Sequence, residues 1–202
     1  MARSGGKPRV GIIISTTRQG RFGDKPAHWI KKLADQHGKL ETEIVDLRDY
    51  PMPFFDQPGS PAYIGTHHDE GKRWVAKMNE LDGYIFVTAE YNHGPSAVLK
   101  NALDHGYNEY NKKPVAFVGY GALGAGRAIQ QLRQNVIELK MAPLRDAVHI
   151  GMTEFLGVLK EGKSLDDYPH LVTTANTLLN ELEWWTLALK AARDAKVTAV
   201  AA

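Results

Sequence analysis

The chain has 202 residues, of which 43% are hydrophobic and 24% charged, which is typical of one folded domain and too apolar for extensive disorder. A net charge of +2 argues against a dedicated nucleic-acid binder, and the lack of cysteine excludes disulfides, thiolate nucleophiles and cysteine-ligated metals. No segment approaches the roughly 20 apolar residues that span a bilayer, and the apolar run near the N-terminus is too short for a signal peptide, so we expect a cytoplasmic protein. We expect a single domain over residues 1–202, with loose termini at residues 1–8 and 197–202.

Short apolar runs alternate along the chain with segments whose apolar residues recur at helical spacing. In chain order these patterns predict a strand at Arg9–Ser15, a helix at Asp24–His37, a strand at Glu41–Leu47, a proline-rich loop at Asp49–Gly59, a helix at Asp69–Leu81, a strand at Gly83–Thr88, a helix from about Pro95 to His105, a strand at Pro114–Gly119, a helix at about Ala125–Lys140, a strand at Leu144–Ile150 and a helix at about Tyr168–Arg193.

Alternating strands and helices indicate an α/β fold with a parallel sheet covered on both faces. Three strands contain continuous apolar runs, at Val10–Ile14, Tyr84–Val87 and Val115–Val118, so we place them at the centre of the sheet. The polar alternation of Glu41–Leu47 predicts an edge strand. In such sheets ligands bind beyond the carboxyl ends of the strands, so the loops that follow the three central strands are the candidate site.

The first of these loops, residues 15–23, reads Ser-Thr-Thr-Arg-Gln-Gly-Arg-Phe-Gly and precedes a helix. A helix N-terminus with free backbone N–H groups binds anions, and arginine adds charge-assisted hydrogen bonds suited to phosphate. The loop lacks the spacing of a nucleoside-triphosphate loop. It predicts a phosphate site, although a solvated turn that only caps the helix would have a similar composition.

The second loop, residues 88–95, reads Thr-Ala-Glu-Tyr-Asn-His-Gly-Pro. Tyr91 and His93 offer flat faces for a planar ligand, and Asn92 offers both a donor and an acceptor. A helix-entry turn capped by Asn92 or Gly94 is the simpler alternative.

The third loop, Gly119–Arg127, contains a G-x-G-x-x-G pattern between a strand and a helix. This pattern is typical of dinucleotide-binding folds, but there it occupies the first strand–helix turn and has an acidic partner at the end of the next strand. Here it occupies a later turn, and Asp146 lies within the following strand. We therefore expect a loop whose backbone approaches a flat ligand, or simply packs a helix on the sheet.

These motifs together resemble the NADPH-dependent FMN reductase family of flavodoxin-like proteins, which includes chromate, quinone and azo-dye reductases. The stretch AEYNHGPSAVLKNALDH at residues 89–105 resembles the family pattern P-E-Y-N-x-S-x-P-x-x-L-K-N-A-I-D, and residues 16–23 are similar to S-x-R-x-G-S-x-N. The resemblance covers roughly residues 9–150. Ala89, Gly94 and Ser96 depart from the second pattern's Pro, Ser and Pro, as Thr16, Arg21 and Gly23 depart from the first pattern's Ser, Ser and Asn.

The resemblance implies a flavodoxin-like three-layer sandwich with a five-stranded parallel sheet of order 2-1-3-4-5 and FMN at its carboxyl edge. It implies that the FMN phosphate is held by Thr16, Arg18, Arg21, Phe22 and Gly23. The ribityl chain and ring would be lined by Ala89, Glu90, Tyr91, Asn92 and His93. The other side of the ring would be covered by Gly119, Tyr120 and Gly121, with backbone N–H groups near Gly119–Gly121 facing it.

The implied activity is an FMN-dependent oxidoreductase that passes hydride from NADPH or NADH through FMN to a quinone, flavin, azo or similar small-molecule acceptor in ping-pong order. No catalytic side chain is expected, since the flavin carries the chemistry. The resemblance also implies a homodimer or homotetramer, and we expect neither a nucleic-acid nor a membrane partner. Three alternatives are a flavodoxin-type electron carrier without nicotinamide turnover, a non-catalytic binding module on the same fold, and a Rossmann-like dehydrogenase using the Gly119 loop.

Three further features lie outside these loops. Phe54, Phe55 and Tyr63 are candidates to cover a flavin or to fill the core edge. His67 and His68 are adjacent and would point apart on a helix or strand, so no metal site is expected. In the last predicted helix the residues at helical spacing, which we expect to face the core, are Val172, Ala175, Leu178, Leu179, Leu182, Trp185 and Leu189. Trp184 and Trp185 cannot both face one core from a helix, so one is a candidate subunit contact.

Overall fold

Runs of Val, Ile, Phe and Tyr form the strands because such side chains can be buried on both faces of a parallel sheet. The computed structural model describes residues 6–200, with side chains to residue 195, and within that range it contains a parallel sheet of order β2-β1-β3-β4-β5. The strands are β1 (Arg9–Ile14), β2 (Glu41–Asp46), β3 (Gly83–Ala89), β4 (Pro114–Tyr120) and β5 (Ala142–Ile150). The predicted order is confirmed, with the three apolar strands at the centre and β2 at an edge.

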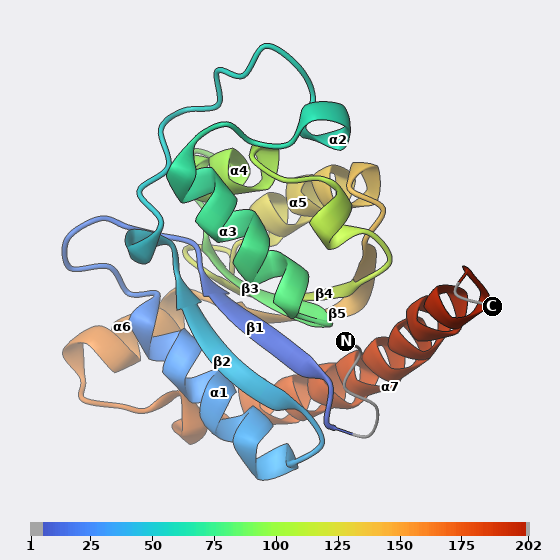
Figure 1. Ribbon diagram of the computed structural model, residues 1–202. Helices are drawn as coiled ribbons and strands as arrows, with labels where there is room; N and C mark the ends of the chain where they lie inside the picture. The colour runs from blue at the N-terminus through green and yellow to red at the C-terminus, as the bar shows by residue number, and fades with distance from the viewer. Residues whose placement is uncertain (1–5, 201–202) are drawn as a thin grey trace.

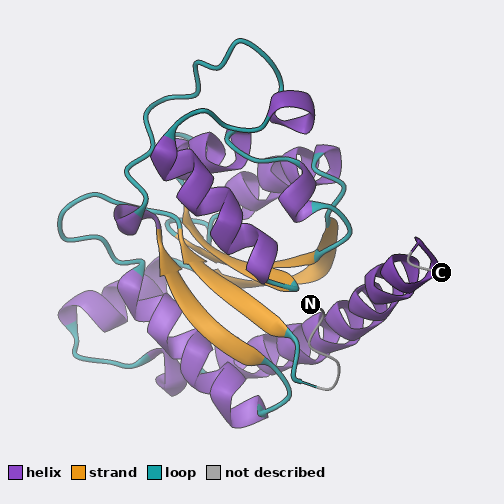
Figure 2. Cartoon of the chain, viewed as in Figure 1, coloured by secondary structure: helices purple, strands orange, loops and turns teal. Residues whose placement is uncertain are grey.

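Helices cover both faces of this sheet (Figures 1 and 2). One face carries α1 (Asp24–His37), α6 (Met152–Lys160) and α7 (Pro169–Val200), and the other carries α3 (Asp69–Glu80), α4 (Ala97–Asp104) and α5 (Gly126–Glu138). A short helix, α2 (Pro61–Ile64), lies in the long segment between β2 and α3. This is the three-layer flavodoxin-like arrangement that the resemblance implies.

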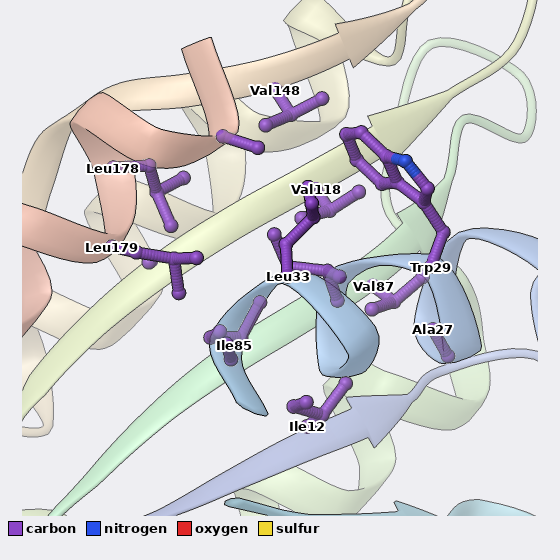
Figure 3. Close-up of a cluster of buried hydrophobic side chains, with 14 of the residues drawn as sticks. Ile12, Ala27, Trp29, Leu33, Ile85, Val87, Val118, Val148, Leu178 and Leu179 are labelled. Carbon is purple, nitrogen blue, oxygen red and sulfur yellow. The ribbon is translucent and has the colours of Figure 1, made fainter. Parts of the chain in front are cut away.

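The core lies between the sheet and each helical layer. On the first face Ile12, Ile85 and Val118 of the strands pack against Leu33 of α1 and Leu178 of α7 (Figure 3). On the second face Phe86 and Phe117 pack with Trp74 and Met78 of α3 and Leu132 of α5. These layers are continuous from β2 to β5, so the loops at the carboxyl edge are built on a rigid base.

Two helices were not predicted, and the last one is longer than expected. The sequence patterns assign no helix to α2 or α6. Helix α7 continues to Val200, beyond the expected end near Arg193; residues 1–5 and 201–202 lie outside the described range. At the other end Pro8 is buried and its carbonyl accepts a hydrogen bond from the Glu41 N–H at 2.9 Å, so it is not loose.

The end of α7 extends beyond the sheet (Figure 1, red). Its Thr186 is fully buried, whereas Trp184 and Trp185 are 62% and 36% exposed and contact each other edge to face. The helical spacing had placed Trp185 inward; the buried stripe passes through Thr186 instead. No helix in the described range is long and apolar enough to cross a membrane.

Candidate functional site

The loops after β1, β3 and β4 meet at the carboxyl edge of the sheet. Figure 1 shows the loop between β1 and α1 projecting beyond the strand ends. The three loops surround a small open pocket of about 140 Å³. It is lined by Arg18, Phe22, Ala89, Glu90, Tyr91, Tyr120, Gly121 and Phe155.

The loop after β1 leaves its backbone donors free. Among the hydrogen bonds of the described residues, none is donated by a backbone N–H between Thr16 and Gly23. Gly23, at the start of α1, provides no side-chain cap. The buried Ser15 hydroxyl has no partner in the described part of the chain, and the exposed Arg18 guanidinium makes no ion pair there. Free N–H groups, an orphan hydroxyl and a free cation are the features of an anion-binding surface.

Arg21 does not belong to that surface. Its side chain is only 3% exposed, and its guanidinium donates to the Thr16 carbonyl at 2.6 Å and to the carboxylates of Asp24 and Asp46. The hydrogen bond to Asp46 raises the pKa of Arg21 above its ordinary value. Burial would raise the pKa of Asp46, but the bonds from Arg21 and from the Arg48 N–H outweigh it and lower that pKa. Arg21 therefore ties the loop to β2, and the expectation of a direct phosphate contact does not fit its geometry.

A second arginine fixes the same loop from outside. Arg48, just after β2, donates from Nε to the Thr17 carbonyl at 3.2 Å and from Nη2 to the Arg18 carbonyl at 2.6 Å. Because these carbonyls are turned toward Arg48, the loop's N–H groups are left for another acceptor. Sequence patterns did not single out Arg48.

The loop after β3 contains a tight hairpin. Tyr91 and Gly94 exchange both backbone hydrogen bonds at 2.9 Å, and the two residues between them, Asn92 and His93, have φ of 49° and 68°. Positive φ at both central positions is typical of a type I′ turn, and Asn and His adopt positive φ more readily than most residues other than Gly. The turn directs Asn92 and His93 away from the pocket lining and leaves Tyr91 on it, 39% exposed.

Glu90 connects the second and third loops. Its carboxylate, 6% exposed, accepts hydrogen bonds from the backbone N–H of Arg127 at 3.1 Å and from the Arg127 Nε at 2.6 Å. Burial opposes ionisation of Glu90, but the bonds from Arg127 and the Ala128 N–H lower its pKa, so it is a carboxylate at neutral pH. Glu90 thus caps the start of α5, and only part of it lines the pocket.

Glycine in the third loop is required by packing. A Cβ at Gly119 would lie 2.6 Å from the Gly124 carbonyl, and Gly121 has φ of +144°. The Gly121 N–H donates to the Ile150 carbonyl at 3.2 Å, whereas the N–H groups of Ala122 and Leu123 donate to no acceptor in the described residues. The free donors expected near Gly119–Gly121 are therefore displaced to Ala122 and Leu123.

An aromatic wall closes the inner side of the pocket. Tyr120 is 5% exposed and packs against Phe22 with ring centroids 5.2 Å apart, and Phe22 contacts Phe155 of α6 at 4.5 Å. The Tyr120 hydroxyl lies 3.0 Å from the Thr16 Oγ1. Burial raises the pKa of Tyr120 to about 12, so its hydroxyl stays protonated.

The predicted residues divide into two groups. Those that line the pocket are Arg18, Phe22, Ala89, Glu90, Tyr91, Tyr120 and Gly121. Those that do not are Thr16, Arg21, Gly23, Asn92, His93 and Gly119. Phe155 was missed, although the apolar spacing of Met152, Phe155, Leu156 and Leu159 could have revealed its helix.

Comparison with known proteins agrees with this arrangement. Residues 8–154 match the model of a family described as NADPH-dependent FMN reductase. The chain belongs to the NADPH-dependent FMN reductase family. An NAD(P)H-dependent FMN reductase of Schizosaccharomyces pombe is 36% identical over 145 residues, covering 70% of this chain and 72% of that protein. A quinone reductase of Pseudomonas putida is 29% identical over 140 residues, covering 65% and 71%.

A solved structure shares the fold over nearly the whole chain. FerB, a flavoenzyme NAD(P)H:(acceptor) oxidoreductase from Paracoccus denitrificans, superposes with a TM-score of 0.65 at 19% identity and covers 91% of this chain and 97% of its own. As a member of the FMN reductase family, the chain is an oxidoreductase whose cofactors are FMN and NAD(P)H. Membership favours the reductase interpretation over the electron-carrier, binding-module and Rossmann-dehydrogenase alternatives.

Proposed function

We propose that the chain binds FMN across the three loops at the carboxyl edge and catalyses NAD(P)H-dependent reduction of small acceptors, quinones in particular. The observation that carries this proposal is the row of unpaired N–H groups at residues 16–23 beside an aromatic pocket. An anion site next to a flat apolar site matches the two ends of a flavin mononucleotide.

The phosphate end fits the loop after β1. The N–H groups between Thr16 and Gly23, the free Arg18 and the orphan Ser15 hydroxyl are donors without acceptors in the described residues. A dianionic phosphate supplies the acceptors. Arg21 and Arg48 act as positioning residues, because both hold carbonyls of this loop.

The ring end fits the aromatic pocket. Its volume of about 140 Å³ is below the roughly 300 Å³ at which ligand pockets start. A three-ring system therefore extends beyond it, with one face open to a nicotinamide or an acceptor. Phe22 and Tyr120 exclude water from the inner side, and the N–H groups of Ala122 and Leu123 are free to donate toward the ring.

FMN held by the loop after β1 and the aromatic pocket would supply the redox chemistry between NAD(P)H and the acceptor, in ping-pong order. Neither pocket residue is suited to donate a proton, because Tyr120, with a pKa of about 12, is a very weak acid and Glu90 is held as a carboxylate by Arg127. Its residues orient the ring and keep one face accessible. We infer quinones as the acceptor class from the quinone reductases among the relatives.

We further propose that the active protein is a homodimer or homotetramer, as the resemblance implies, and that it acts in the cytoplasm, as the sequence patterns lead us to expect. Light scattering of the purified chain tests the oligomeric state directly.

A fluorescence titration tests FMN binding. Adding flavin-free protein to FMN should quench flavin fluorescence and saturate at one FMN per chain. Arg18→Ala should weaken binding roughly 10- to 150-fold, since a hydrogen bond to a charged group contributes about 1.5–3 kcal/mol. Arg145→Ala, at a side chain 95% exposed, is the matched control and should bind as the wild type does. No quenching at protein excess, or unchanged affinity of Arg18→Ala, would overturn the proposed site.

Kinetics with the loaded enzyme test the reaction. NAD(P)H oxidation should depend on a quinone, and double-reciprocal plots at several quinone concentrations should be parallel. Intersecting lines would contradict the ping-pong order while leaving FMN binding intact.

A further inference from the structure

A second cluster of ligand-type side chains lies outside the flavin pocket, in the segment between β2 and α3. Asp56, His67 and His68 bring one carboxylate oxygen and two imidazole nitrogens within 4.8 Å of one another. Within the described residues no other group of three His, Cys, Asp or Glu side chains does so. The sequence had suggested that the two histidines point apart, and this is wrong.

The histidines converge because they lie on neither a helix nor a strand. His68 is the extended residue that precedes α3, with φ −73° and ψ 135°, and His67 comes before it in the loop. Their rings lie close together and tilted, with centroids 4.0 Å apart and an interplanar angle of 37°. Both Nε2 atoms turn to the same Asp56 oxygen, that of His68 at 2.7 Å and that of His67 at 3.7 Å.

The cluster is held in place from α4 and its C-terminal end. His105, fully buried, contacts the Pro53 carbonyl through Nε2 at 3.0 Å and the Thr66 hydroxyl through Nδ1 at 3.2 Å. It thereby joins Pro53, three residues before Asp56, to Thr66, the residue before His67. The Gln57 side chain also accepts a hydrogen bond from the His67 N–H at 3.0 Å. A site anchored in this way loses little conformational entropy when a ligand binds.

The spacing of the donor atoms suits a small metal ion. Zinc bonds of about 2.1 Å at tetrahedral angles place the ligand atoms roughly 3.4 Å apart. The two separations from Asp56, 2.7 and 3.7 Å, bracket this value. Neither Nε2 has another partner in the described residues, so only the Asp56 carboxylate competes for them.

The donor set also selects the kind of ion. Two imidazoles and one carboxylate suit zinc and similar first-row ions, whereas Mg²⁺ and Ca²⁺ prefer oxygen ligands alone. Asp56 and His67 are 65% and 52% exposed, and His68 is 24% exposed, so solvent reaches the cluster. A fourth coordination position would be open to water.

We propose that Asp56, His67 and His68 bind one divalent transition-metal ion, for which Zn²⁺ is the probe, at a site independent of the flavin pocket. The bound ion links residues 12 positions apart in sequence and closes the segment that carries α2. Tyr63, 89% exposed, lies in this segment, and Phe54, 81% exposed, lies two residues before it. Metal binding would therefore restrain the most exposed aromatic side chains of the described chain.

Metal titration of the untagged, chelator-treated full chain tests the proposal. Zn²⁺ competition against a chromophoric chelator should give one site per chain, and Co²⁺ should develop the visible absorption of a tetrahedral complex. Loss of a residue that only supports a metal ligand weakens metal binding by up to about 100-fold. Loss of a ligand should cost at least as much, so we expect Zn²⁺ affinity to fall by about 100-fold or more in each of three variants, His67→Ala, His68→Ala and Asp56→Asn. His170→Ala is the matched control, because His170 is an exposed histidine beside a carboxylate, 3.2 Å from Glu154; it should bind as the wild type does.

Limited proteolysis gives a second measurement that requires no enzyme activity. Zn²⁺ should slow chymotryptic cleavage after Phe54 and Tyr63 in the wild type and in His170→Ala, and should have no effect in His68→Ala. Circular dichroism checks that each variant is folded, and Asp56→Asn replaces any histidine variant that is not. Absence of a saturable site, or equal binding by the three variants and the wild type, would leave only a surface Asp–His hydrogen bond and overturn the proposal.

Discussion

The two arginines of the first loop should respond differently to substitution. Arg21→Leu removes a guanidinium that is 3% exposed and leaves the Thr16 carbonyl and the Asp46 carboxylate without their shared donor. Arg18→Ala removes a side chain that makes no ion pair in the described residues. We therefore expect Arg21→Leu to reduce the stability of the flavin-free protein and Arg18→Ala to reduce FMN affinity alone.

The expected magnitude follows from burial. Breaking a buried ion pair costs about 3–5 kcal/mol, because it leaves an uncompensated charge. The Asp24 and Asp46 side chains are 43% and 21% exposed, so water replaces part of what Arg21 provides. We expect a loss of about 2–4 kcal/mol of unfolding free energy, which for a domain of this size lowers the Tm by roughly 4–16 °C. Arg18→Ala should stay within about 0.5 kcal/mol of the wild type.

Urea unfolding of the flavin-free proteins separates the two roles. A shift in midpoint for Arg21→Leu without a change in slope would show a loss of native stability. FMN titration of the same samples gives the second quantity. If Arg21→Leu were as stable as the wild type and lost as much FMN affinity as Arg18→Ala, Arg21 would be a phosphate ligand and the positioning role would be refuted.

Three further substitutions test separate parts of the structure. Burial lowers the pKa of Lys113 to about 7, whereas in the unfolded chain Lys113 keeps its proton up to about pH 10.5. The unfolding free energy of the wild type, relative to that of Lys113→Met, should therefore rise between pH 7 and 10 by at most roughly 1.4 kcal/mol per pH unit. Parallel pH profiles of the two proteins, measured by urea unfolding, would contradict this. Gly121→Ala should lower the unfolding free energy by about 1–3 kcal/mol, because φ of +144° is strained for alanine even where space exists. Gly126→Ala places its new Cβ with no atom within 4 Å and should be neutral or slightly stabilising. Equal Tm shifts for the two variants in thermal unfolding would refute the argument from φ. Glu90→Gln should cost about 1–2 kcal/mol by weakening the bonds to Arg127, and an unchanged Tm would show that the pair contributes nothing measurable.

The fold was largely predictable because its signals are local. The helix at Asp24–His37 ends where expected, at Gly38, whose φ of 73° is the left-handed conformation that glycine adopts readily. Apolar runs identified the central strands. Helix α6 was missed because it is short, follows β5 after the single residue Gly151 and buries only Gly157 completely.

The wrong assignment of Trp185 has a different cause. From Leu182 a helical stripe can continue at the third or the fourth residue, which here are Trp185 and Thr186. Hydrophobicity favours Trp, but the structure buries Thr186, whose hydroxyl is satisfied by the Leu182 carbonyl at 2.5 Å. A local pattern cannot show that this turn of α7 packs against Gly83 at the start of β3, where a Cβ would lie only 3.2 Å from the Thr186 Oγ1 and the close approach of helix and strand favours a small side chain.

The roles of the charged residues depend on contacts between distant segments. Arg21 finds Asp46 25 positions away because β2 lies beside β1, and Glu90 finds Arg127 37 positions away because β4 lies beside β3. Composition located the loops, but both arginines of the first loop looked equally suited to phosphate. Once Arg21 is committed to two carboxylates, anion binding falls to backbone N–H groups and to Arg18. Such a site depends more on the shape of the loop than on its side chains, and this explains how Thr16, Arg21 and Gly23 can depart from the family pattern while the site keeps its free donors.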